Sequence, residues 1–204
     1  MNILKEKLKE AYYSFLKKKF KNENFTIISN NCFGGVIYKN FKIEYKSPTC
    51  GLFFMPGDYI KFVYNLKKYL CEDIKEISIN ESNYSDYLRK IKYTAPIGKI
   101  DDIEIFFLHY DSFEEAVEKW NRRKSRIVWK NIIYKFNDQN QCGYSELEAF
   151  DKFKADKKIC FTAKKYSNIN TIQLKQFEEY ENVLSDTKYN DYKNYIDIFE
   201  LINR

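Results

Sequence analysis

Histidine is the scarcest residue type in this chain of 204 residues, which contains a single one, His109. Because histidine is the usual general base at neutral pH, any acid–base mechanism that uses a histidine must use His109. Glycine and proline are also sparse, with 6 and 3 residues. Two of the six glycines, Gly34 and Gly35, nevertheless stand together just after Cys32, with only Phe33 in between. That placement calls for a physical reason.

The cysteines lack the spacing of a metal site or of a disulfide framework. They are odd in number and widely separated, and no CxxC pair occurs, which excludes a zinc-finger pattern and fits a reducing cytosol. No apolar run approaches the roughly 20 residues needed to cross a bilayer. Met1 is followed by a lysine-rich amphipathic pattern instead of a signal peptide, so we expect a cytoplasmic protein. The five cysteines are Cys32, Cys50, Cys71, Cys142 and Cys160.

Apolar and aromatic residues, by contrast, are abundant. They make up 44% and 18% of the chain, which excludes a disordered protein and supplies a large core. The formal net charge is +6, and mild positive charge favours anionic partners such as nucleotides, phosphorylated glycans or an acidic membrane surface. A concentrated basic stripe is missing, so we expect no nucleic-acid partner.

The first segment of the chain has the apolar spacing of an amphipathic helix over residues 3–20. Because most such apolar stripes serve as core, we expect residues 1–22 to form a helix packed on an α/β domain of residues 23–204. Peripheral association of this lysine-rich helix with an anionic membrane is the alternative. The apolar face comprises Ile3, Leu4, Leu8, Ala11, Tyr12, Phe15, Leu16 and Phe20.

Strand and helix patterns alternate along the remainder of the chain. This alternation predicts a single compact α/β domain with a largely parallel or mixed sheet flanked by helices. Expected strands are Phe25–Ser29, Phe41–Tyr45, Ile74–Ile79, Ile103–Leu108, Ile132–Phe136 and Lys158–Thr162. Helices are expected from Pro56, with Asp58 as N-cap, over Ser112–Ile127, with Ser112 and Glu115 as a capping box, over Ser145–Phe153 and near Tyr192–Ile202. Val36–Tyr38 begins either a helix or a short return segment, and Tyr84–Ile91 is either a weak helix or an irregular segment.

Polar residues follow several of these strands. In an open α/β sheet, ligands bind outside the carboxyl ends of the strands. If the strands are parallel neighbours, the residues that follow them converge on one edge of the sheet. These residues are Asn30, Asn31 and Cys32 after the first strand, His109 and Tyr110 after the strand at 103–108, Asn137 and Asp138 after that at 132–136, and Lys164 and Lys165 after that at 158–162.

Cys32 combines a strand end with the adjacent glycine pair. Backbone N–H groups at a helix N-terminus or in a nest stabilise a thiolate and lower its pKa. Cys32 as nucleophile, His109 as base and Asp138 or Asn137 as the orienting group form one hypothesis. A loop at Gly34 and Gly35 that cradles a phosphate is the second. A buried structural cysteine is the third.

Arg123 falls on the apolar line of the helix at 112–127. A buried cation requires a partner. We expect either an internal carboxylate such as Asp102 or an anionic ligand, and we favour the internal pair.

Several segments of this chain resemble a bacterial family of uncharacterised proteins, a domain of unknown function, over residues 24–204. They are "ISNNCFGGVIY", "YKSPTCGLFFMPGDYIKFVYNLKKYL", "APIGKIDDIEIFFLHYDSFEEAVEKWNRRKSRI" and "FTAKKY". Members are often labelled exopolysaccharide biosynthesis proteins, which implies a glycan-precursor context but no defined reaction. Phe33 replaces an expected tryptophan, and Phe107 stands near an expected histidine, which disfavours mechanisms with two histidines.

Two classes of function follow. The first is a transferase acting on an exopolysaccharide or capsule precursor, by acyl transfer through Cys32 and His109 or by glycosyl transfer from a nucleotide sugar. The second is a non-catalytic binding or regulatory module. The sequence does not identify a cofactor and contains no specific metal-ligand spacing, and it leaves metal dependence and the oligomeric state open. Expected substrate-binding residues are Asn30, Asn31, Gly34, Gly35, Tyr110 and Arg123.

Overall fold

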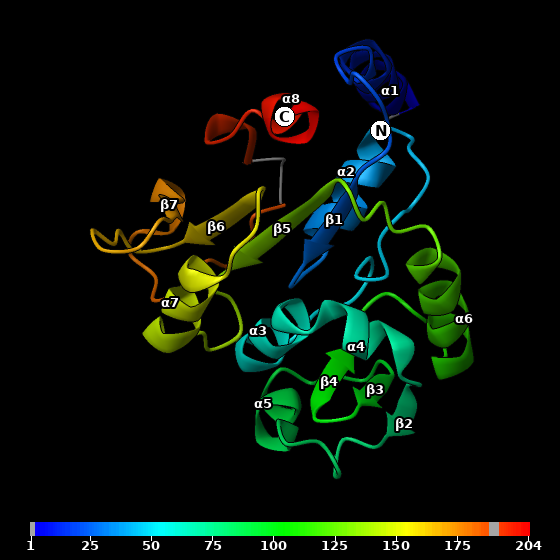
Figure 1. The fold of residues 1–204 in the computed structure, drawn as a ribbon, viewed down its shortest axis with the longest axis vertical. Coiled ribbons are helices and arrows are strands. Elements are labelled where there is room, and N and C mark those ends of the chain that lie inside the picture. The colour runs from blue at the N-terminus through cyan, green and yellow to red at the C-terminus, as the bar shows by residue number, and fades with distance from the viewer. Residues whose placement is uncertain (1–2, 188–191) are drawn as a thin grey trace.

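The computed structural model describes the backbone of residues 3–187 and 192–204 and the side chains from residue 7 onward within those ranges. Its strands form two sheets (Figure 1). The main sheet is parallel throughout, in the order β1 (Thr26–Ser29), β5 (Ile132–Asn137), β6 (Lys158–Thr162) and β7 (Ile172–Gln173). The small sheet is antiparallel, in the order β2 (Lys75–Ile77), β3 (Ile97–Ile100) and β4 (Ile103–Phe106).

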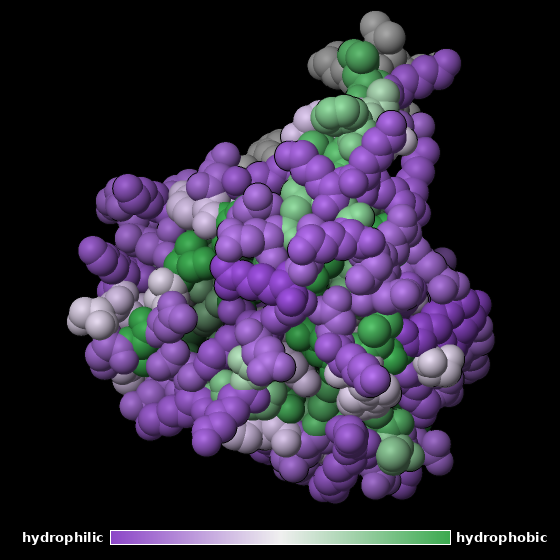
Figure 2. All heavy atoms as spheres, turned by 45° about the horizontal axis from the view of Figure 1, so that its top comes forward, coloured by the Kyte–Doolittle hydropathy of each residue, from purple (hydrophilic) through white to green (hydrophobic). Residues whose placement is uncertain are grey.

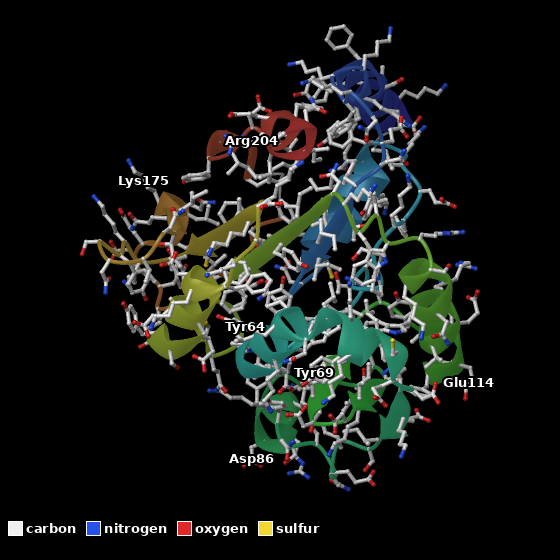
Figure 3. The ribbon with its side chains drawn as sticks, viewed as in Figure 1. Tyr64, Tyr69, Asp86, Glu114, Lys175 and Arg204 are labelled. Atoms are coloured by element: carbon white, nitrogen blue, oxygen red, sulfur yellow. The ribbon has the colours of Figure 1, made fainter. Side chains whose placement is uncertain are left out.

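Helices surround both sheets. Figure 1 shows α3 and α4 between the main sheet and the small sheet, α6 at one side, and α1 and α8 at the opposite end from the small sheet. Tyr64 and Tyr69, labelled in Figure 3, belong to α3 and α4, and the Tyr64 hydroxyl donates to the Ala149 carbonyl of α7 at 2.9 Å. The helices are α1 (Ile3–Lys17), α2 (Phe33–Asn40), α3 (Pro56–Tyr64), α4 (Leu66–Cys71), α5 (Ser85–Lys90), α6 (Phe113–Lys124), α7 (Tyr144–Lys152), α8 (Ile198–Asn203) and the 3-10 turn η1 (Lys175–Phe177).

The two faces of the main sheet bury two separate apolar cores, because successive side chains of a strand point to opposite faces. In β1, Ile27 belongs to the core shared with α2 and α8, whereas Ile28 belongs to the core shared with α3, α6 and α7. Cys160 and Phe161 divide in the same way in β6. Burial on both faces explains why these strands are continuous apolar runs in the sequence.

The predicted α/β class, with a parallel sheet flanked by helices, is confirmed, but the strands divide between two sheets. The expected strand Ile103–Leu108 forms β4 over Ile103–Phe106, which belongs to the small antiparallel sheet and is not a neighbour of β1. None of the helices in the described part of the chain is both long enough and apolar enough to cross a lipid bilayer.

Three local predictions are wrong. Phe41–Tyr45 is irregular: Phe41 and Ile43 are buried as the alternation requires, but Lys42 has a φ of 51° and the segment joins no strand. The last helix covers only Ile198–Asn203 of the expected 192–202. Met55 is the N-cap of α3, and Asp58 instead accepts a hydrogen bond from Glu104 N at 3.0 Å.

Candidate functional site

A pocket of about 460 Å³ lies between α2, the loop of residues 47–51 and α6. Its walls come from segments far apart in the sequence, and it brings together several of the residues expected at the site. Expected residues in its lining are Cys32, Gly35, His109, Tyr110 and Arg123. The other lining residues are Val36, Lys39, Tyr45, Cys50, Gly51 and Lys119.

The glycine pair at the start of α2 has a packing explanation. A Cβ on Gly34 would lie 3.1 Å from the Ile27 carbonyl oxygen and 3.3 Å from Ile27 Cβ, so glycine allows α2 to pack closely on β1. A Cβ on Gly35 would be 3.6 Å from Cys50 Cβ, an ordinary contact. Gly34 therefore allows the close contact between α2 and β1. Gly35 lines the pocket with its backbone and places no side chain there.

Cys32 occupies the N-cap position of α2, as its place before the glycines suggests. Its thiol is directed to the Leu52 carbonyl oxygen, 3.9 Å away. Burial raises the pKa of Cys32 to about 11, and the nearby Asp186 carboxylate adds to that shift, while Lys135 opposes it. The expected lowering of the Cys32 pKa is therefore wrong, because removal of the thiolate from water raises the pKa by more than the positive charge of Lys135 lowers it.

Alkylation should reveal this raised pKa directly. At pH 7.5 we expect Cys32 to react with iodoacetamide at least about 100-fold more slowly than the exposed Cys71, since only a thiolate fraction on the order of 10⁻³ or less is available. The rate at Cys32 should rise about tenfold per pH unit up to pH 10. Peptide mapping by mass spectrometry measures both sites, and His109→Ala should leave the Cys32 rate unchanged. Equal rates at Cys32 and Cys71 would contradict the raised pKa.

Arg123 is brought to the pocket by α6. Ser112 caps this helix as predicted, its Oγ accepting from Glu115 N at 3.2 Å, although Glu115 reaches back to Asp111 N at 3.1 Å and not to Ser112 N. The Arg123 side chain is only 7% exposed. A cation at this depth is costly unless it is paired.

The partners of Arg123 are neutral groups. Its Nη1 donates to the Cys50 carbonyl at 3.0 Å and to the Tyr110 hydroxyl at 2.6 Å, and its guanidinium lies 4.8 Å from the ring centre of Tyr45. In the described ranges no carboxylate forms an ion pair with Arg123. The expected partner Asp102 instead pairs with Lys61 at 2.9 Å, so the favoured internal pair is wrong.

The remaining ionisable groups leave the pocket positively charged. Burial raises the pKa of Tyr110 and of Cys50 to about 12 each, against the opposing charge of Arg123, so both are neutral at pH 7. Lys39 and Lys119 add positive charge, although Lys119 also pairs with Glu115. Of the described residues that line the pocket, none is an aspartate or a glutamate. Such a pocket favours an anion.

His109 lines the same pocket, but the strand before it belongs to the small sheet and not, as expected, to the main sheet. It follows β4 of the small sheet, and its N–H donates to the Gly51 carbonyl at 3.0 Å, which fixes it beside the pocket loop. The His109 side chain is exposed to solvent and lines the rim of the pocket. Cys32 and His109 thus line one pocket without sharing a sheet edge.

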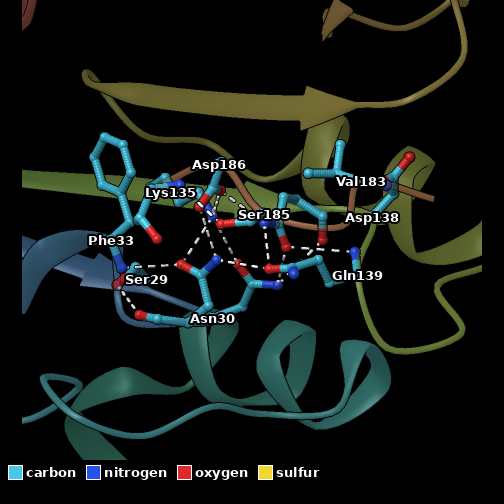
Figure 4. Close-up of polar contacts among 12 residues, drawn as sticks. Ser29, Asn30, Phe33, Lys135, Asp138, Gln139, Val183, Ser185 and Asp186 are labelled. Atoms are coloured by element: carbon cyan, nitrogen blue, oxygen red, sulfur yellow. Dashed lines mark hydrogen bonds and ion pairs between the residues drawn. The ribbon is translucent and has the colours of Figure 1, made fainter. Parts of the chain in front are cut away.

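The polar residues after β1 and β5 do converge at the carboxyl edge of the main sheet, where the parallel pairing predicts them (Figure 4). Asn30 Nδ2 donates to Asn137 Oδ1 at 2.8 Å. At this edge Lys135 and Asp186 form an ion pair in which both side chains are fully buried. Burial lowers the pKa of Lys135, and the Asp186 carboxylate opposes that shift. We refer to these groups, together with Asn31 and Gln139, as the edge network.

The edge network is distinct from the pocket. Asp138 accepts from Ala163 N at 2.8 Å and from Val183 N at 2.7 Å, so its carboxylate ties down two backbone segments. Neither Asp138 nor Asn31 is in the pocket lining, and the role of Asp138 as orienting group for His109 gains no support. Lys164 lies at the surface, where its Nζ donates to the Glu178 carbonyl at 2.6 Å.

Two lysines of the pocket follow from helical periodicity that the sequence reasoning did not use. Lys119 is one turn before Arg123 on α6, and Lys39 is one turn after Gly35 on α2, so each pair shares a helix face. Tyr45 and Cys50 come from irregular chain and have no such signal. Among the described residues, no group of three or more His, Cys, Asp or Glu side chains is arranged to hold a metal ion.

Comparison with known proteins places the whole chain in a family. The family model described as "Domain of unknown function (DUF1919)" matches residues 3–203. The chain belongs to this family. An uncharacterized protein of Haemophilus influenzae is 29% identical over 190 residues, which cover 92% of this chain and 86% of that relative. The resemblance to an uncharacterised bacterial family is confirmed at this level. Neither description mentions exopolysaccharide, so that context becomes a proposal.

Proposed function

We propose that the pocket binds the phosphate groups of a nucleotide sugar, and that the protein is a transferase acting on a glycan precursor of bacterial exopolysaccharide or capsule. The observation that carries the proposal is Arg123, a buried guanidinium without a carboxylate partner among the described residues, beside two lysines. A planar guanidinium binds phosphate oxygens in a fork, and phosphate would supply the missing negative charge. The polysaccharide context rests on the sequence resemblance alone.

The basic side chains and the histidine of the pocket could each have a role in glycosyl transfer. An acceptor hydroxyl would attack the anomeric carbon of the donor sugar while the bond from that carbon to the diphosphate oxygen breaks. Arg123, Lys119 and Lys39 would stabilise the charge that develops on the leaving diphosphate. His109, at the rim, would accept the proton of the acceptor hydroxyl.

Acyl transfer through Cys32 is supported less well. A thiol with a pKa of about 11 is almost entirely protonated at neutral pH, and the thiolate is the nucleophile. We therefore assign Cys32 to the wall of the pocket and not to a covalent step.

Thermal shift and calorimetric titration test the binding step. We expect nucleotide sugars with a uridine or guanosine diphosphate group to stabilise the wild type, and the free sugars to have no effect. Arg123→Met should weaken binding by about 10- to 150-fold, which corresponds to the roughly 1.5–3 kcal/mol of a hydrogen bond to a charged group.

The matched control is Arg122→Met, because Arg122 is adjacent on α6 but exposed and paired with Glu118 at 2.8 Å. It should bind as the wild type does. Equal loss in both variants, or no stabilisation of the wild type by any nucleotide sugar, would refute the proposal.

A non-catalytic binding module is the second candidate, because a positively charged pocket can bind an anion without turnover, and the unactivated Cys32 thiol argues only against acyl transfer. Substitution of His109 distinguishes a transferase from a binding module. For a transferase, His109→Ala should retain nucleotide-sugar affinity within about threefold and lose turnover by about 10²–10⁴-fold. Wild-type binding without turnover of any acceptor would identify a binding module.

A further inference from the structure

Part of the apolar face expected over residues 3–20 points away from the body of the protein, whereas Leu16 and Phe20 pack against the core shared with α2 and α8. Leu8, Tyr12 and Phe15 are 62%, 51% and 68% exposed, and Ala11 on the same face is exposed as well. Their spacing of three and four residues places them on one side of the helix. Figure 2 shows green apolar side chains beside purple ones on the projecting part of the molecule, where Figure 1 places α1.

The opposite side of α1 attaches the helix to the body. Tyr13 is buried and packs edge-on against Phe41, with ring centres 5.0 Å apart. Glu10 pairs with Lys42 at 3.2 Å on the side of the helix that faces the body. Helix α1 is therefore attached to the body through Tyr13 and Glu10, and the exposure of Leu8, Tyr12 and Phe15 does not result from a detached helix.

Charge is concentrated on the same segment. Residues 1–21 contain seven lysines and two glutamates, a net charge of +5, whereas the whole chain carries +6. The remaining 183 residues are thus almost neutral. Lys7, Lys9, Lys18 and Lys19 are exposed around the apolar face. A lysine flank beside an aromatic and aliphatic face is the pattern of helices that lie in the interface of anionic membranes.

We propose that α1 docks reversibly on an anionic lipid bilayer, with Leu8, Tyr12 and Phe15 inserted at the level of the headgroups and the lysines in contact with lipid phosphates. A second copy of the chain fits the face less well, because it would bring two segments of charge +5 together. The inference is independent of the proposed function, because it uses none of the pocket residues.

Vesicle flotation of the full chain tests this docking. We expect the wild type to float with vesicles of phosphatidylcholine mixed with phosphatidylglycerol, to stay behind with phosphatidylcholine alone, and to be released by high salt. Leu8→Ser/Phe15→Ser should reduce binding by at least about tenfold, and Lys18→Gln/Lys19→Gln should also reduce it. Both pairs are exposed, so each variant should unfold at the wild-type temperature.

Leu184→Ser/Ile91→Ser is the matched control, because these side chains are 56% and 44% exposed but lie outside α1. It should bind vesicles as the wild type does. Three results would overturn the inference: no flotation of the wild type, equal flotation of Leu8→Ser/Phe15→Ser, or a wild-type dimer in vesicle-free light scattering that the same substitutions dissociate. The last would assign the face to a second copy.

Discussion

Replacing Asp186 with alanine is expected to lower the free energy of unfolding by about 3–5 kcal/mol, because it leaves the Lys135 ammonium buried without its counter-charge. Lys135 and Asp186 are both fully buried. Asp186 also accepts from the half-buried Asn31 Nδ2 at 3.0 Å and from the buried Asn137 Nδ2 at 2.7 Å, so the substitution removes an acceptor from each of these amides as well. Urea denaturation at pH 7.5 measures the loss.

The control for Asp186→Ala is Glu118→Ala, which breaks an exposed ion pair with Arg122 and should cost at most about 1 kcal/mol. The double variant Lys135→Met/Asp186→Leu should be less destabilised than the sum of its single substitutions, since no unpaired charge remains. A loss below about 1 kcal/mol for Asp186→Ala, or strict additivity in the double variant, would show that the pair is not coupled in the folded protein.

Gly98→Ala is expected to destabilise the protein by about 1–3 kcal/mol through overpacking of the small sheet. A Cβ on Gly98 would lie 2.6 Å from Ile74 Cγ2 and 2.8 Å from Phe107 Cε2. Phe107 is fully buried, and its ring packs edge-on against Tyr110, with centres 5.6 Å apart. Displacement of Phe107 is therefore transmitted to the pocket wall.

Two measurements separate these effects. Chemical denaturation gives the loss of stability, and nucleotide-sugar affinity of the folded Gly98→Ala protein should fall because Tyr110 is an acceptor for Arg123. Gly57→Ala is the matched control: a Cβ there meets nothing within 4 Å, and its place in the first turn of α3 should make alanine neutral or stabilising by up to about 1 kcal/mol. Equal stability of the two variants would refute the overpacking.

Three strands of the main sheet, β1, β5 and β6, were predictable because burial on both faces leaves a continuous apolar run, whereas the two-residue strand β7 was not predicted. Thr26–Ser29, Ile132–Asn137 and Lys158–Thr162 follow this pattern. The polar ends of the first two strands meet as parallel pairing requires, whereas Lys164, after the third, lies at the surface. Phe41–Tyr45 has an alternating pattern instead and forms no strand, because alternate burial in an irregular segment produces that pattern without any pairing partner. Periodicity reports burial, and hydrogen-bond pairing depends on tertiary neighbours.

The candidate site was predictable in its residue types more than in its geometry. Cys32 and His109 line one pocket although the expected shared sheet edge does not exist, since β4 belongs to the small sheet. Arg123 stood out because a cation lay on an apolar helix line, but its partner depends on which loop the fold brings beside it. The Cys32 pKa could not be predicted from position alone, because it depends on burial by distant segments.

The edge network has a consequence for the order of synthesis. Lys135 leaves the ribosome about 50 residues before Asp186, the residue that neutralises it. Until the segment around Asp186 has emerged, a nascent chain that closed the β1–β5 pair would enclose an uncompensated ammonium group. The centre of the main sheet is therefore expected to remain open during translation and to close only when the last quarter of the protein has been made.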